Sequence, residues 1–184
     1  MPIEYRRLVC SRLDEAEQAE IARVDLLAGH LRERLELAAA DIDLQHVHGA
    51  QSSAIQGLVS AILRHELAFS EEVVLTPQTG LVTRARPDFV YQLGPGRGVI
   101  AEVERGGTVT NNHDLKDMWK AHVAPDAHHL FLVVPRANWN LAGRAREQPF
   151  VRVCHRLSAF FGDARREVDV LSCHVFGYGR VSLG

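Results

Sequence analysis

The sequence predicts an α/β domain, and three observations lead to this. Residues 14–40 repeat apolar side chains at intervals of three and four, as one face of a helix does. Residues 89–103 contain two short apolar runs joined by a turn rich in glycine and proline, which is typical of a β-hairpin. Residues 130–134 are entirely apolar, as expected for a strand buried inside a sheet. With 184 residues, 46% of them hydrophobic, the chain is long enough to bury one sizeable core.

The first expected element is a long amphipathic helix over residues 14–40. Its apolar stripe consists of Ile21, Val24, Leu27, Leu31, Leu35 and Ala38. The polar residues 41–49 are expected to connect this helix to the next one. We treat residues 1–48 as an N-terminal helical extension within a single domain, 1–184. The long helix packs across the domain or pairs with a second copy in a homodimer, and the sequence favours neither arrangement.

A second helix is expected from Ser52 or Ser53 to Leu67. One stripe of this helix contains Gln51, Ile55, Val59, Ile62 and Glu66. Glu66 should therefore point where the apolar residues point, and a buried carboxylate requires a partner. Either Glu66 joins an acidic site, or it forms an ion pair with Arg64 or another arginine.

Three strands, a helix and a fourth strand should complete a core of residues 49–135. Residues 72–77 form the first strand, residues 81–91 lead into and form the second, and residues 99–103 form the third. A helix then begins at Asn111 or Asn112 and ends near His122. Its inward stripe is expected to contain Leu115, Met118, Trp119 and His122. Residues 130–134 form the last core strand.

Residues 136–184 should add a further helix and strand to this core. A surface loop is expected around residues 138–143, followed by an amphipathic helix over 150–161 and a strand over 168–176. Arginines accumulate in this part of the chain and offer a phosphate-contacting region, or else a solvated surface. They are Arg136, Arg144, Arg146, Arg152, Arg156, Arg165 and Arg166.

The hairpin should bring three carboxylates together. If its turn is symmetric about Pro95, Asp88 lies opposite Glu102. Because side chains alternate along a strand, Glu102 and Glu104 share a face with Ile100. Opposed carboxylates repel each other unless a cation compensates, and hard cations such as Mg²⁺ take oxygen ligands. The alternative is that both glutamates line a wet strand face and bind nothing.

The order Pro87-Asp88, Glu102-Val103-Glu104, helix and apolar strand resembles the PD-(D/E)XK nuclease superfamily, which has the restriction-endonuclease-like fold. The resemblance covers residues 51–135. It implies a core of helix, three strands, helix and strand, and a Mg²⁺-dependent endonuclease in which Mn²⁺ can substitute. Asp88 and Glu102 would bind the metal, with help from the backbone carbonyl of Val103. The sequence departs from the superfamily at Glu104, where the motif has lysine, although some restriction endonucleases carry glutamate there.

The departure at Glu104 leaves the general base open. Glu104 would bind a second metal or position the attacking water, and Glu66 would be an outer acidic member of the site. Lys116 or Lys120 would replace the motif lysine, and we prefer Lys116 because it lies nearer the helix start. Alternatively, both lysines face solvent. The residues expected to contact nucleic acid are Gln51, Asn111, Asn112, Lys120 and Arg136, although the asparagines can equally cap the helix.

Composition excludes several other classes. The net charge of −2 is not that of a nonspecific nucleic-acid binder. Cys10, Cys154 and Cys173 are widely spaced and odd in number, so we expect buried thiols instead of disulfides or a zinc site. The absence of a P-loop argues against a nucleotide cofactor. We find neither an apolar run as long as a membrane span nor a signal peptide, so we expect a cytoplasmic protein without a membrane partner.

These features predict a Mg²⁺-dependent DNA endonuclease that hydrolyses phosphodiester bonds. A dimer would match a palindromic site, but this expectation rests on the resemblance alone. The alternative is a catalytically inactive, nuclease-derived module that binds DNA or protein. A third reading is a small interaction domain built around the N-terminal helix.

Overall fold

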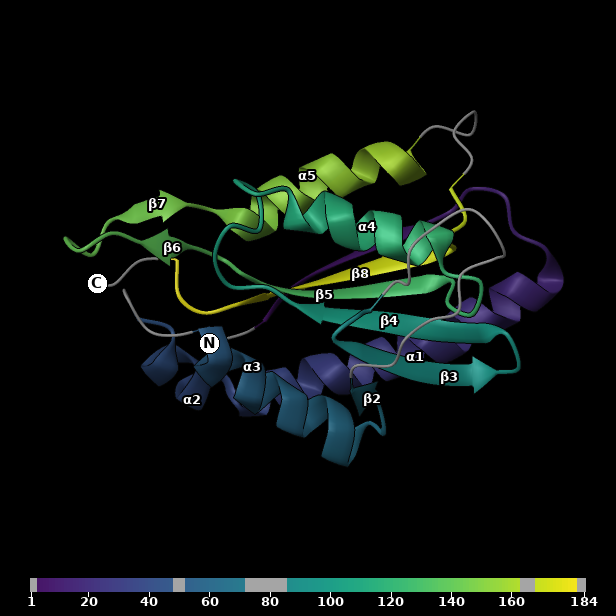
Figure 1. The fold of residues 1–184 in the computed structure, drawn as a ribbon, viewed down its shortest axis with the longest axis horizontal. Coiled ribbons are helices and arrows are strands. Elements are labelled where there is room, and N and C mark those ends of the chain that lie inside the picture. The colour runs from purple at the N-terminus through teal and green to yellow at the C-terminus, as the bar shows by residue number, and fades with distance from the viewer. Residues whose placement is uncertain (1–2, 48–51, 72–85, 163–167, 182–184) are drawn as a thin grey trace.

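The fold is a mixed β-sheet with helices on both of its faces (Figure 1). The structure is a computed structural model, and it describes residues 3–47, 52–71, 86–162 and 168–181. The sheet has six strands in the order β1-β8-β5-β4-β3-β2. The predicted α/β class is therefore confirmed.

The elements have the following bounds. The strands of the main sheet are β1 Glu4–Val9, β2 Ser70–Glu71, β3 Phe89–Gly94, β4 Arg97–Val103, β5 His129–Pro135 and β8 Ser172–Tyr178. A separate hairpin consists of β6 Asn138–Trp139 and β7 Ala145–Glu147. The helices are α1 Glu15–Leu37, α2 Ala39–Gln45, α3 Ser52–Ala61, the π-helical turn η1 Ile62–Glu66, α4 His113–Val123 and α5 Pro149–Phe161.

Strand β5 lies at the centre of the sheet, parallel to both β4 and β8. Every residue of β5 is buried, which confirms the prediction made from its apolar run. The neighbouring β3–β4 hairpin is antiparallel and pairs Phe89 with Ala101 and Val90 with Ile100. This is the register predicted from a turn centred on Pro95, although a bulge shifts it by one residue near the turn.

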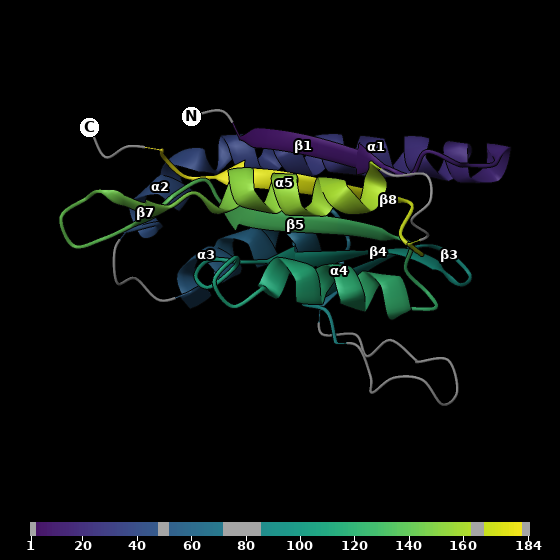
Figure 2. The ribbon, with the colours of Figure 1, turned by 90° about the horizontal axis from the view of Figure 1, so that it is seen from above.

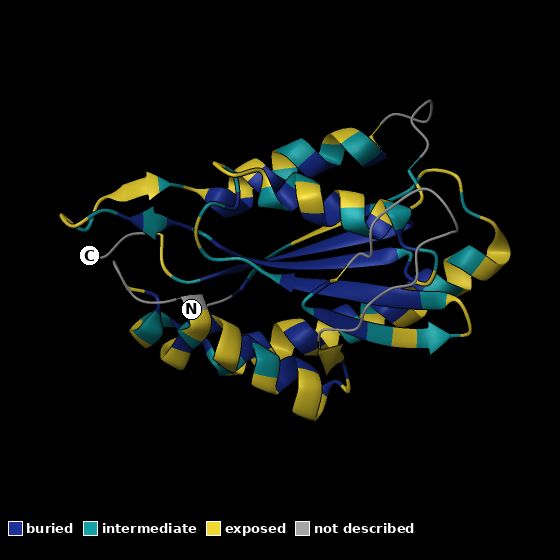
Figure 3. Ribbon diagram, in the orientation of Figure 1, coloured by how far each residue is buried: buried dark blue, intermediate teal, exposed yellow. Residues whose placement is uncertain are grey.

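Two apolar cores lie on opposite faces of the sheet. Helices α1, α2 and α3 cover one face, and α4 and α5 cover the other (Figure 2). Side chains of β4 alternate between the two cores, with Val99 and Ala101 in the first and Ile100 in the second. In Figure 3 the strands of the sheet are mostly buried, whereas each helix has a buried side and an exposed side. No helix in the described ranges combines the length and apolar character that crossing a membrane requires.

Helix α1 begins where its sequence supplies a cap. The Asp14 carboxylate accepts a hydrogen bond from the Glu17 amide, and Glu17 returns one to the Asp14 amide, which forms a capping box. The predicted stripe is confirmed, because Ile21, Val24 and Leu31 are buried against the sheet. The connection expected at 41–49 was wrong in its first half, because residues up to Gln45 form α2.

The second helix ends in a π-helical turn that the sequence analysis did not anticipate. In η1 the Leu67 amide donates to the Ile62 carbonyl, five residues earlier, so the helix turns more widely than an α-helix. Ile62 and Leu63 are buried, whereas Glu66 lies on the exposed side. The stripe that placed Glu66 inward assumed an uninterrupted α-helix, and the π turn breaks that periodicity.

Strand β1 was missed by the sequence analysis. It pairs with β8, with Glu4 opposite Gly177 and Val9 opposite Ser172, so the first residues belong to the same sheet as the core. The expected surface loop at 138–143 is wrong for its first two residues, because Asn138–Trp139 pairs as a strand with Ala145–Glu147, whereas residues 140–143 form the loop between them. Helix α5 agrees with the prediction, and the final strand begins at Ser172 instead of 168. The expected strand at 72–77 and the segment 81–85 lie outside the described residues.

Candidate functional site

A cluster of ionisable side chains lies beneath α4, where β3 begins and β4 ends. Asp88 immediately precedes β3, Glu102 is on β4, and Glu104 follows β4 directly. Glu102 forms its ion pair with α4, so it lies on the same face as Ile100, as the alternation of side chains predicted. We call Asp88, Glu102, Glu104, Asp117 and Lys120 the carboxylate cluster.

Asp88 and Glu102 are joined through the backbone of the hairpin. The Val103 amide donates to Asp88 Oδ2 at 3.1 Å, and the Asp88 amide donates to Glu102 Oε2 at 3.3 Å. These bonds fix each carboxylate against the neighbouring strand. The predicted juxtaposition of Asp88 and Glu102 is therefore confirmed.

Lys120 supplies the positive charge of the cluster. Its ammonium lies 2.7 Å from Glu102 Oε1 and 3.0 Å from Asp117 Oδ1. The side chains of Glu102 and Asp117 are each only 3% exposed, so the two carboxylates share one cation in a nearly dry environment. When both carboxylates are ionised, their negative charges exceed the charge of Lys120 by one.

Burial shifts the protonation of these groups. Desolvation raises the pKa of Glu102, and the neighbouring Asp117 raises it further, while Lys120 opposes both effects. Desolvation likewise raises the pKa of Asp117 against the opposing charge of Lys120. Burial alone would lower the pKa of Lys120, but the two carboxylates outweigh it and raise that pKa. Lys120 is therefore a cation, and its carboxylate partners hold protons more readily than exposed carboxyls do.

Glu104 has a separate partner. Its Oε2 atom lies 2.8 Å from His113 Nδ1 at the start of α4. Burial raises the pKa of Glu104, and the bond with His113 lowers it again in part. The backbone carbonyl of Glu104 accepts a hydrogen bond from the buried Tyr178 hydroxyl at 2.9 Å, which attaches the end of β4 to the end of β8. Glu104 is thus a partly buried carboxylate beside an imidazole.

The other predicted catalytic residues lie away from the cluster. Glu66 forms an ion pair with Arg34 on the opposite face of the sheet, which is the alternative that the sequence left open. Lys116 is exposed on α4, whereas Lys120, one turn later, reaches the cluster and pairs with Glu102. The geometry therefore favours Lys120 over Lys116 as the lysine of the site.

The residues expected to contact nucleic acid are scattered. Asn111 and Asn112 are exposed just before α4, and Asn112 accepts a hydrogen bond from Arg156 instead of capping the helix through its side chain. Arg136 is bound to Glu4 and to the Gly179 carbonyl. Lys120 belongs to the carboxylate cluster, and Gln51 lies outside the described residues.

Asp117 and His113 were missed because the inward side of α4 was misassigned. The buried residues of α4 are Asp114, Asp117, Met118 and Ala121, whereas Trp119 is 50% exposed and His122 is exposed. A signal was available in the sequence, because Asp114, Asp117 and Ala121 have helical spacing. Two aspartates on a buried stripe are tolerated here because Arg156 and Lys120 neutralise them.

The oxygen atoms of the carboxylate cluster are of the type that binds a hard cation. Asp88, Glu102, Glu104 and Asp117 offer carboxylate oxygens, the ligands that Mg²⁺ prefers, and Asp117 Oδ2 is buried without a hydrogen-bond partner. Among the described residues, however, no three His, Cys, Asp or Glu side chains stand close enough together to hold a metal as they are. A cation would therefore require these carboxylates to move closer together.

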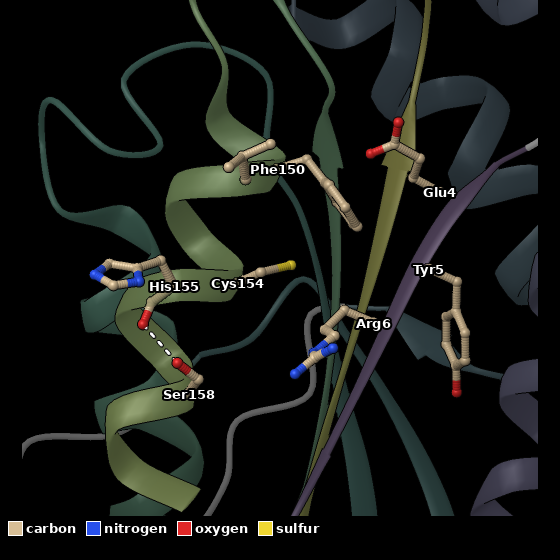
Figure 4. Close-up of a pocket in the computed structure, with 8 residues that line it drawn as sticks. Glu4, Tyr5, Arg6, Phe150, Cys154, His155 and Ser158 are labelled. Atoms are coloured by element: carbon tan, nitrogen blue, oxygen red, sulfur yellow. Dashed lines mark hydrogen bonds between the residues drawn. The ribbon is translucent and has the colours of Figure 1, made fainter. Parts of the chain in front are cut away.

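A hollow elsewhere on the surface does not involve these residues. It has a volume of about 510 Å³ and lies between β1 and α5, where Arg6, Cys154 and His155 line it (Figure 4). Burial raises the pKa of the Cys154 thiol to about 11, so this cysteine stays protonated near neutral pH. The hollow contains no member of the carboxylate cluster.

No protein-family model matches the sequence, and no curated protein matches it. The resemblance to the PD-(D/E)XK superfamily therefore stays a prediction carried by the residues themselves.

Proposed function

We propose that this chain is a Mg²⁺-dependent endonuclease that hydrolyses phosphodiester bonds in DNA, with a restriction-endonuclease-like core. The observation that supports the proposal best is the pairing of Asp88 with Glu102 across the hairpin, beside Lys120. An aspartate, a glutamate on the adjoining strand and a lysine together provide metal ligands and a cation for a phosphate. Carboxylates on facing strands repel each other, so this pairing needs a compensating cation.

In this proposal Asp88, Glu102 and the Val103 carbonyl hold the metal, and the Glu104 carboxylate stays free to act on the attacking water. A bound Mg²⁺ would polarise the phosphate and lower the pKa of a water molecule. Lys120 has three N–H donors and contacts two carboxylates among the described residues, so a phosphate oxygen can take a place beside it. Because Lys120 is on α4, its ammonium group lies beside Glu102 near the end of β4.

Glu104 and His113 serve as the base in this scheme. A half-buried carboxylate with a raised pKa accepts a proton from water more readily than an exposed one, and the imidazole 2.8 Å away orients it. This assignment accounts for Glu104 in place of the motif lysine. Glu104 itself takes the proton, and Lys120 provides the positive charge.

A second candidate is an inactive module that binds DNA or protein. The observation that favours it is that each carboxylate of the motif already has a partner within the protein: Lys120 for Glu102, His113 for Glu104 and the Val103 amide for Asp88. In such a module the cluster would serve only to hold α4 on the hairpin.

Cleavage of DNA decides between the two. Supercoiled plasmid, linear duplex, single-stranded DNA and RNA are incubated with Mg²⁺, Mn²⁺ or EDTA. Asp88→Asn keeps a side-chain oxygen that can accept the hydrogen bond from the Val103 amide, so the variant should fold. The matched control is Asp126→Asn, an exposed aspartate in the turn after α4.

The proposal expects metal-dependent cleavage that Asp88→Asn abolishes and Asp126→Asn retains. Cleavage that is equal in both variants would mean that the activity comes from another site or a contaminant. If the folded wild type cuts none of the substrates with either metal, but binds DNA in EDTA, the inactive module is the correct function.

A further inference from the structure

We propose that the β6–β7 hairpin and the start of α5 form an arm that binds the phosphate backbone of duplex DNA, with Leu141 inserted into a groove. The inference rests on the proposed nuclease function and names the surface that holds the substrate. We call residues 138–152 the duplex arm. Its β6–β7 hairpin extends past the C-terminal end of β5 (Figures 1 and 2).

The arm begins just after β5, at the same end of the sheet as the carboxylate cluster. Strands β4 and β5 are parallel, with Glu102 beside Leu132 and Val103 beside Val133, and the arm starts at Asn138. Five residues of extended chain span about 17 Å. One turn of duplex DNA is about 34 Å long. A duplex lying on the cluster would therefore reach the base of the arm within one turn.

The arm is rich in arginines that carry no neutralising partner. Arg144, Arg146 and Arg152 are exposed, and we find no carboxylate paired with any of them in the described part of the chain. Arg136 and Arg156, in contrast, are paired with Glu4 and Asp114. Among the described arginines between residues 136 and 156, the structure thus separates those that hold the fold from those that face solvent, and Arg165 and Arg166 lie outside the described residues.

Two of these arginines line a hollow at the base of the arm. Its volume is about 320 Å³, and it lies between β7 and α5 with Arg146, Gln148 and Arg152 on its walls. Glu147 also lines it but is half-buried, so the exposed charge of the hollow is positive. Guanidinium groups recognise phosphate through paired hydrogen bonds, and the glutamine amide adds a neutral donor.

The tip of the arm presents an apolar side chain in a fixed loop. Leu141 is 91% exposed. Asn140 Oδ1 accepts hydrogen bonds from the amides of Ala142 and Arg144 at 2.9 and 3.0 Å, and Gly143 takes a positive φ of 69° to close the turn. Apolar wedges flanked by arginines are inserted between base pairs by proteins that bend DNA.

Binding is measured by fluorescence anisotropy with a labelled 24-base-pair duplex in EDTA, so that cleavage cannot occur. The variant R144Q/R146Q/R152Q should bind at least tenfold more weakly. Its plot of log affinity against log salt should be shallower by about 2 to 3, because each lost phosphate contact contributes about 0.9. The control is R12Q/R23Q/R32Q, which removes three exposed arginines near and on α1.

Insertion of the tip is measured with 2-aminopurine in the duplex. Its fluorescence should rise on binding of wild type and should not rise with Leu141→Ala, while Leu26→Ala, an exposed leucine of α1, should behave as wild type. An equal rise with Leu141→Ala would remove the tip from the interface and overturn that part of the inference.

Three results would overturn the arm as a whole. They are equal loss of affinity in the two arginine variants, no duplex binding by wild type at 50 mM salt, and arm-dependent binding to phosphatidylserine vesicles without binding to duplex. Cleavage that persists at the wild-type KM in R144Q/R146Q/R152Q would reject the arm and leave the proposed nuclease intact. Arm-dependent binding without cleavage would support the arm and reject the proposed nuclease.

Discussion

Replacing Lys120 by methionine should strongly destabilise the fold. Lys120 is the cation shared by Glu102 and Asp117, whose side chains are each 3% exposed. Removing one partner of a buried ion pair costs about 3 to 5 kcal/mol, because an uncompensated charge is left in a dry environment. The Lys120 side chain is itself 25% exposed, so solvent screens part of its interaction, and we expect a loss of about 3 kcal/mol.

The assay is urea unfolding of wild type, Lys120→Met and the double variant Lys120→Met/Glu102→Gln at pH 7.5. The double variant should regain only part of the lost stability, because the amide at position 102 carries no charge but the buried Asp117 carboxylate still lacks its cation. The stability of Lys120→Met should also rise as the pH is lowered from about 8 to about 5. Burial raises the pKa of Glu102 and Asp117, so the folded state binds protons more tightly than the unfolded state in this range.

A loss below about 1 kcal/mol in Lys120→Met, the size typical of an exposed ion pair, would refute this reasoning. It would mean that water reaches the cluster or that the carboxylates are already protonated in the wild type. A loss of the expected size without any pH dependence would point to lost packing of the lysine stem instead of lost charge.

Two further predictions concern stability away from the cluster. Desolvation lowers the pKa of the buried His174 to about 3. Below about pH 6.5 the unfolded state therefore binds a proton that the folded state does not bind, and the free energy of unfolding should fall by about 1.4 kcal/mol for each pH unit. In urea titrations at pH 7, 6 and 5, the free energy of unfolding of His174→Gln should fall less steeply with decreasing pH than that of wild type, by the contribution of one bound proton. An unchanged dependence on pH would assign the acid sensitivity to other groups. Asp14→Ala should cost about 1 kcal/mol by removing the capping box of α1. Glu15→Ala, in the same first turn, is the control for Asp14→Ala, and a similar loss in both would show that the cap contributes nothing specific.

Local periodicity was sufficient for the features closest to the cluster. The alternation of side chains placed Glu102 and Glu104 on the face of Ile100, and the turn around Pro95 gave the register that opposes Asp88 and Glu102. Both inferences depend on residues only a few positions apart along the chain. The structure agrees with them for that reason.

The errors arose where distant contacts decide the outcome. Strand β1 forms because β8 accepts it, and its alternation of charged and apolar residues is weak without that partner. Helix α4 buries Asp117 instead of Trp119 because Lys120, on the same helix, pairs with Asp117 and with Glu102 of β4, and the helix sequence alone does not reveal the contact with β4. The π turn that exposes Glu66 has no recognisable signature in the sequence.

The pairing of β1 with β8 also imposes an order on biosynthesis. Tyr5 and its hydrogen-bond partner His174 are 169 positions apart. A ribosome adding roughly 5 to 20 residues per second needs roughly ten to thirty seconds to cover that interval. During that time the segment containing Ile3 and Leu8 has emerged without the strand that later covers it. The β1 segment is therefore made long before β8, and it can take its place in the sheet only after β8 has been synthesised.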